Sequence, residues 1–121
     1  MAMFMKFYSG DGAYAVDITD LSGVIGRPAI TPVPMAPPQV AGIFLSRGKV
    51  WTAVEPGALS GKRAVEGQYA ILLDSKDGDL ALLAQSIGDI FEKVSGDEIK
   101  GFVLMTPESL LAAIGEAMSV G

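Results

Sequence analysis

The residues that could carry chemistry in this chain begin with a glycine-rich segment at residues 57–63 (GALSGKR). It approaches the pattern of a phosphate-binding loop, in which backbone N–H groups and a Lys-Ser/Thr pair hold phosphate and magnesium. The segment is one residue shorter than that pattern, and Arg63 stands where the Ser or Thr should be. We therefore interpret it as an ordinary loop and not as a nucleotide site.

A second candidate, residues 74–79 (DSKDGD), resembles the start of a calcium-binding loop. Such a loop needs oxygen ligands at positions 1, 3 and 5 and a glutamate at position 12. Here Lys76 occupies the third position and Gln85 the twelfth. An Asp-Gly pair between two apolar runs is typical of a hairpin turn, so we predict a solvated turn and no metal site.

Carboxylates are the remaining candidates for acid–base chemistry, as the pair Asp17 and Asp20 or the pair Asp97 and Glu98. Neither pair has a nucleophile near it in the sequence, and solvated carboxylates need no special explanation in an acidic chain. The chain also contains no His and no Cys. These absences exclude a Ser-His-Asp triad, a thiol nucleophile and His- or Cys-ligated metals. We expect no enzymatic activity, no metal and no cofactor.

Length and composition indicate a single domain over residues 1–121. Half of the residues are hydrophobic and only 19% are charged, so apolar surface is left for a partner. The net charge of −5 argues against nucleic-acid binding. No apolar run approaches the roughly 18 residues of a membrane helix, and the N-terminus does not resemble a signal peptide. We expect a cytoplasmic protein without membrane insertion.

The hydrophobic pattern predicts about seven short strands, most of them in hairpins with turn residues between them. The predicted strands are residues 3–8, 13–18, 42–45, 49–54, 68–74, 80–84 and 99–105. Residues 28–38 contain five prolines and are predicted to form an extended loop, because proline removes the N–H donors that a strand needs. This pattern of short strands is typical of a small β-barrel.

Two helices and one helical turn are predicted between and after these strands. Apolar residues recur at helical spacing within 86–94, and Thr106 followed by Pro107 is typical of a helix start. Thr19 and Asp20 are in a position to cap a helical turn that the glycines after it interrupt.

Three features suit protein binding, although each has a simpler explanation. Residues 34–37 match the P-x-x-P pattern that fits a partner's aromatic groove, but an extended loop explains them more simply. Arg47 lies at an expected hairpin tip, where a polar residue is ordinary. Trp51 follows in the next strand, where a lone Trp is more often part of the core, although Trp and Arg are both enriched at interfaces.

Residues 30–50 (ITPVPMAPPQVAGIFLSRGKV) resemble the CheW-like family of chemotaxis coupling domains. The resemblance lies in the Pro-Val-Pro run, a later proline, Gly42 and the Arg47-Gly48 pair before a β-run. The opening hairpin fits as well, and residues 69–90 fit more loosely, so the resemblance covers most of residues 3–112.

The resemblance implies a mainly β fold of two packed SH3-like five-stranded barrels with a C-terminal helix. It also implies a non-enzymatic adaptor that joins chemoreceptors to a CheA-type histidine kinase. By position, Leu21, Gly42 and Arg47 would lie where the family contacts receptor or kinase, in the groove between the barrels. Ile30 would lie in the partner-facing strand region of the first barrel.

The sequence departs from the family pattern at three places. Residues 54–57 replace an Asp-Leu-Arg-like stretch, and Gly23 stands where the family has an acidic residue. The segment after Val94 is also shorter than usual, so the second barrel is expected to lack a strand. An exposed edge would favour an alternative, in which the CheW-like fold serves as a self-associating structural or regulatory module that forms homo-oligomers.

Overall fold

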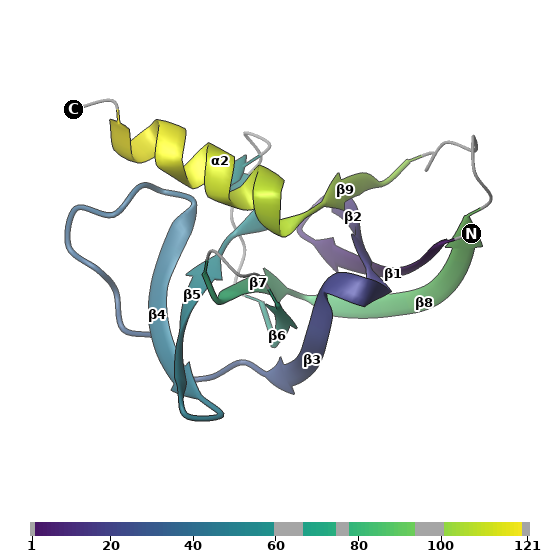
Figure 1. Ribbon diagram of the computed structural model, residues 1–121, viewed down its shortest axis with the longest axis horizontal. Helices are drawn as coiled ribbons and strands as arrows, with labels where there is room; N and C mark the ends of the chain where they lie inside the picture. The colour runs from purple at the N-terminus through teal and green to yellow at the C-terminus, as the bar shows by residue number, and fades with distance from the viewer. Residues whose placement is uncertain (1, 60–66, 75–77, 94–100, 120–121) are drawn as a thin grey trace.

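Two β-sheets form the body of the computed structural model, which describes residues 2–59, 67–74, 78–93 and 101–119 (Figure 1). The 4-stranded sheet has the order β8-β1-β2-β9, and the 5-stranded sheet has the order β3-β6-β7-β5-β4. The strands are β1 (Ala2–Ser9), β2 (Gly12–Asp17), β3 (Leu21–Gly26), β4 (Val40–Ser46), β5 (Lys49–Val54), β6 (Tyr69–Leu73), β7 (Leu80–Ala84), β8 (Ser86–Lys93) and β9 (Val103–Met105). A 3-10 turn spans Ile18–Asp20, and the helices are α1 (Pro56–Leu59) and α2 (Pro107–Ser119).

The three predicted hairpins are confirmed, since β1 with β2, β4 with β5 and β6 with β7 are antiparallel pairs. The β4–β5 turn consists of Arg47 and Gly48, which both have positive φ angles, 54° and 72°. Two such residues make the turn type whose twist matches that of paired strands. The predicted proline-rich loop is confirmed too, with one isolated bridge between Thr31 and Ile43.

Strands β6 and β7 form the middle of the molecule and contribute to two hydrophobic cores. Ile71, Leu73 and Leu82 pack with Phe7 and other side chains of the 4-stranded sheet. Side chains that alternate with these pack inside the 5-stranded sheet, where they meet Phe44 and Trp51. Burial on both faces explains why the two strands are apolar without interruption. Trp51 is a core residue, and its Nε1 donates a 2.9 Å hydrogen bond to the carbonyl oxygen of Ser46.

The helix predicted over residues 86–94 is wrong, because Ser86–Lys93 forms strand β8. This segment pairs with β1 along nearly its whole length, and Phe91 stacks on Phe4 at a ring distance of 5.7 Å. Gly88 lies close against Tyr8, where a Cβ atom would be 3.0 Å from the ring. Sheet pairing and close packing therefore override the helical spacing of the apolar residues. Val94 lies outside the described residues.

The region after β2 also differs from the sequence prediction. Asp17, rather than Thr19, caps the turn at Ile18–Asp20, because its Oδ1 accepts a 2.9 Å hydrogen bond from the Thr19 amide. The glycines that were expected only to interrupt a helix lie in strand β3, which pairs with β6. Antiparallel pairing with a buried strand compensates for the weak β-propensity of glycine.

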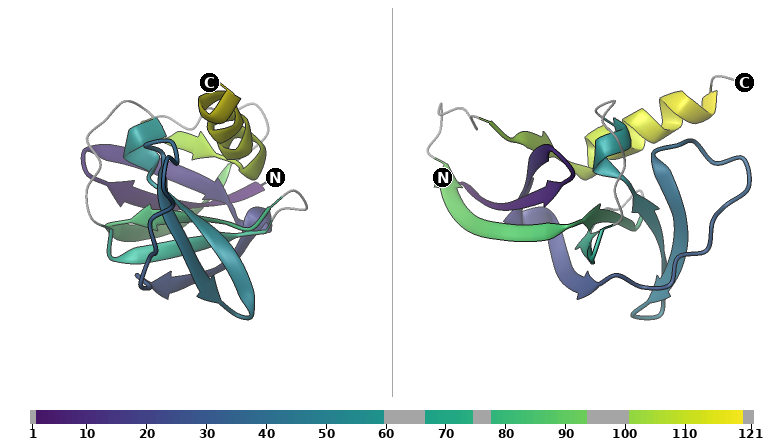
Figure 2. Two further views of the ribbon diagram at one scale, coloured as in Figure 1. Left: turned by 90° about the vertical axis from the view of Figure 1, so that its left-hand side faces the viewer. Right: turned by 180° about the vertical axis from the view of Figure 1, so that it is seen from behind.

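The predicted C-terminal helix is confirmed as α2, and Thr106 is its N-cap. The Thr106 Oγ1 accepts a 3.1 Å hydrogen bond from the amide of Ser109, whose side chain in turn accepts one from the Thr106 amide. The helix runs from β9 in the 4-stranded sheet towards the loop between β3 and β4 (Figures 1 and 2). It therefore brings the C-terminal part of the chain close to the other sheet.

The fold is the predicted mainly β arrangement of two packed, barrel-like units with a C-terminal helix. Over the described residues, the sheet that contains both the N-terminal hairpin and β9 has 4 strands and the other has 5. The shortened segment that motivated the expectation of a missing strand falls largely within residues 94–100, which lie outside the described residues.

Candidate functional site

Arg47 reaches from the β4–β5 turn to strand β3. Its Nη1 donates hydrogen bonds of 3.2 Å to the carbonyl oxygen and 3.4 Å to the Oγ of Ser22. Gly23 gives the guanidinium the space it occupies, since a Cβ atom at Gly23 would lie 2.6 Å from Nη2. Strands β3 and β4 are the two outer strands of the 5-stranded order, so Arg47 links the two ends of that sheet. The residue is nevertheless exposed, as expected of a hairpin tip.

Leu21 lies immediately before Ser22, at the first position of β3. Its side chain is half-buried and packs against the core between the two sheets. Leu21 is therefore the sequence neighbour of Ser22, the residue that Arg47 contacts, and its own side chain contributes to core packing.

Gly42 and Ile30 form a second pair, where the proline-rich loop meets β4. Gly42 has a φ angle of 150°, and a Cβ atom there would lie 2.3 Å from the Thr31 carbonyl oxygen and 2.8 Å from Cγ2 of Ile30. Thr31 exchanges two backbone hydrogen bonds with Ile43, of 2.8 and 2.9 Å. The absence of a side chain at Gly42 thus lets the proline-rich loop lie directly on β4, and Ile30 packs onto the core of the 5-stranded sheet.

The sequence reading missed an exposed apolar surface on the β4–β5 hairpin. Ile43, Leu45 and Val50, which we call the outer strip, point away from the core on the face opposite to Phe44 and Trp51. Leu45 pairs directly with Val50, and their exposed fractions are 73% and 58%. The side chains of β4 alternate between the core and the exposed face. The sequence does not reveal this alternation, because both faces of the strand carry apolar residues.

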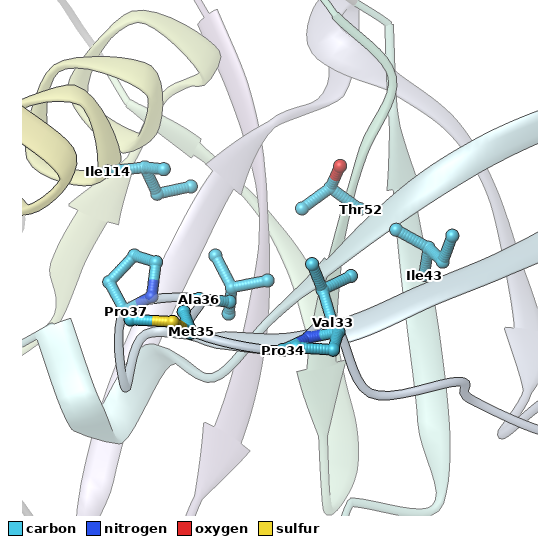
Figure 3. Close-up of a pocket in the computed structure, with 9 residues that line it drawn as sticks. Val33, Pro34, Met35, Ala36, Pro37, Ile43, Thr52 and Ile114 are labelled. Carbon is cyan, nitrogen blue, oxygen red and sulfur yellow. The ribbon is translucent and has the colours of Figure 1, made fainter.

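A pocket of about 330 Å³ continues the outer strip towards α2 (Figure 3). The strands contribute Val40, Ile43 and Thr52. Ile114 of α2 faces the loop from the other side. The complete lining is Val33, Pro34, Met35, Ala36, Pro37, Val40, Ile43, Thr52 and Ile114. The Thr52 hydroxyl is the one polar side-chain group in this lining, so the pocket suits an apolar group and offers no acid, base or nucleophile couple.

Of the carboxylates considered for acid–base chemistry, Asp17 has a structural role as a cap. The Oδ1 of Asp17 accepts hydrogen bonds from the amide and the hydroxyl of Thr19. Partial burial raises the pKa of Asp20, and the nearby Asp17 and Glu108 raise it further. Asp97 and Glu98 lie outside the described residues. Within the described parts of the chain, no three potential metal-ligating side chains come together.

Glu55 follows β5 and is the other carboxylate with a shifted pKa. Burial raises its pKa, and the charge of Arg27 lowers it by a smaller amount. The Glu55 Oε2 and the Gln39 Oε1 are buried atoms without a hydrogen-bond partner among the described residues. Two further motifs fall only partly within the described residues. Residues 57–59 of the glycine-rich segment 57–63 belong to α1, and residues 60–63 lie outside the described residues. In the segment 74–79, Asp79 lies 3.7 Å from the Nζ of Lys49, and residues 75–77 lie outside the described residues.

Comparison with known proteins agrees with this architecture. A model of the CheW-like domain matches residues 3–113. Among solved structures, the scaffolding protein TtCheW from Thermoanaerobacter tengcongensis superposes with a TM-score of 0.70 at 18% identity. The match covers 78% of this chain and 63% of that protein, so the chain spans less than two thirds of its structural relative. No curated protein matches the sequence. In the described part of the chain, no helix has the length and apolar character needed to cross a membrane.

Proposed function

This chain belongs to the CheW-like domain family, and on that premise we propose that it is a non-catalytic adaptor of chemotaxis-type signalling. In this role it couples chemoreceptors to a CheA-type histidine kinase through protein–protein contacts. The observation that carries the proposal is the position of Arg47, an exposed arginine held at a hairpin tip by Ser22. Arginine is among the residues that contribute most to binding at protein interfaces.

The four proposed partner-binding residues have different roles. Arg47 contacts the partner directly, because its guanidinium is exposed and has five N–H donors, of which Ser22 engages only part. Leu21, Ile30 and Gly42 position the surface around it through packing and through the close approach of the proline-rich loop to β4. Substitution of these three is therefore expected to change stability together with binding.

Binding of the cognate kinase and receptor to the Arg47→Glu variant tests this proposal. We expect at least about a tenfold loss of affinity while the domain remains folded, because the side chain is exposed. The variant Arg47→Glu with Glu92→Lys is the matched control, since it restores the net charge at an exposed site on β8. Unchanged binding by Arg47→Glu, or full recovery in the control, would show that Arg47 is not a contact residue. If the wild-type chain binds neither kinase nor receptor, the adaptor role is wrong.

Self-association is a second candidate function, favoured by the surface of β9. Among the described residues this short strand lies at the end of the 4-stranded order, and it exposes Val103 and Leu104. An apolar edge strand can pair with a second copy of the same chain. Sedimentation analysis should then show dimers or larger species that Leu104→Lys dissociates, whereas a monomer at every concentration contradicts this function.

A further inference from the structure

We draw no further inference here: the strongest candidate, the apolar pocket between the proline-rich loop, the β4–β5 hairpin and helix α2, with the exposed Met35 on its loop side, carries none because nothing in the structure shows what covers it.

Discussion

The guanidinium of Arg47 donates a 3.2 Å hydrogen bond to the carbonyl oxygen of Ser22, 25 residues earlier in the chain. The bond fixes the direction of a long side chain that would otherwise sample many rotamers. A partner that binds the remaining donors of Arg47 therefore meets a side chain whose entropy is already reduced. The same bond connects the β4–β5 turn to β3, so partner binding at the turn is physically linked to the edge of the sheet.

Gly23→Ala tests the importance of this arrangement for binding. The added Cβ would lie 2.6 Å from Nη2 of Arg47, so the flexible end of that side chain must move. We expect little change in the free energy of unfolding, within about 0.5 kcal/mol, because an exposed guanidinium relocates easily. Partner affinity should nevertheless fall, as measured by titration calorimetry with the kinase or receptor.

A second substitution, Gly23→Glu, separates the geometric effect from charge. Its carboxylate can pair with Arg47 and occupy the donors that a partner would bind, so affinity for the kinase or receptor should fall further than in Gly23→Ala. Equal affinities of the wild type and both variants would contradict the assigned role of Arg47 at the surface.

Gly42→Ala is expected to destabilise the fold by about 1–3 kcal/mol. The new Cβ would lie 2.3 Å from the backbone oxygen of Thr31, and the φ angle of 150° is unfavourable for any residue with a side chain. Because the obstacle is backbone, relief requires the proline-rich loop to move off β4. Urea denaturation measures the change as a lower transition midpoint.

Two other glycines serve as controls for Gly42→Ala. Gly48 has a φ angle of 72°, but a Cβ atom added there would have no other atom within 4 Å, so Gly48→Ala reports backbone strain alone, about 1 kcal/mol. Gly26 has open space and no positive φ, so Gly26→Ala should be close to neutral. A Gly42→Ala effect no larger than that of Gly48→Ala would show that the loop contact is easily adjusted.

Local sequence signals predicted the elements whose determinants lie within a few residues. The hairpin turn at Arg47-Gly48 and the capped start of α2 at Thr106 are of this kind. Strand β8 was mispredicted because Ile87, Ile90 and Phe91 have helical spacing, and only the presence of β1 beside them selects a strand. Long-range pairing of this kind is not encoded in local periodicity.

The candidate site, like the fold, was predicted only where local sequence or the family resemblance identified single residues. The resemblance to CheW-like domains singled out Arg47 and Gly42, but their contacts with Ser22 and Thr31 depend on how distant segments meet. The exposure of Leu45 and Val50 could not be read from the sequence, because β4 is apolar on both faces and only the packing of Trp51 shows which face is the core.

Lys6 lies over two aromatic rings, one on β8 and one immediately before β9, and its replacement should destabilise the fold. Its Nζ is 5.1 Å from the ring centroid of Phe91 and 4.9 Å from that of Phe102. Lys6→Met keeps the length and apolar packing but removes the charge, so a loss of about 0.5–2 kcal/mol is expected. Lys6→Glu should cost more, because the ring faces repel an anion.

Lys49→Met is the matched control for Lys6, since Lys49 is exposed and, among the described residues, its Nζ faces one ring, that of Trp51 at 5.8 Å. The variant also removes the ion pair of Lys49 with Asp79, but an exposed pair of this kind contributes little to stability. Thermal unfolding should rank the variants as Lys49→Met nearest the wild type, then Lys6→Met, then Lys6→Glu. Equal melting temperatures for Lys6→Met and Lys6→Glu would show that the rings do not recognise the charge of Lys6.

Glu55 should make the fold less stable as pH rises. Burial raises its pKa in the folded state, and Arg27 compensates only partly. A carboxyl whose pKa is higher in the folded than in the unfolded chain binds its proton more tightly when folded. Its contribution to stability is therefore complete below the unfolded pKa and is lost as pH rises through the folded pKa.

Glu55→Gln tests this sign directly, because the amide keeps the size of the side chain without a charge. The variant should be more stable than the wild type at neutral pH, and the difference should shrink as pH falls to the range where Glu55 is protonated. Denaturation series at several pH values measure this difference. Asp74→Asn, which removes an exposed carboxylate after β6, is the control for the loss of one negative charge. A Glu55→Gln variant that is less stable than the wild type at neutral pH would mean that the ionised carboxylate stabilises the fold through Arg27.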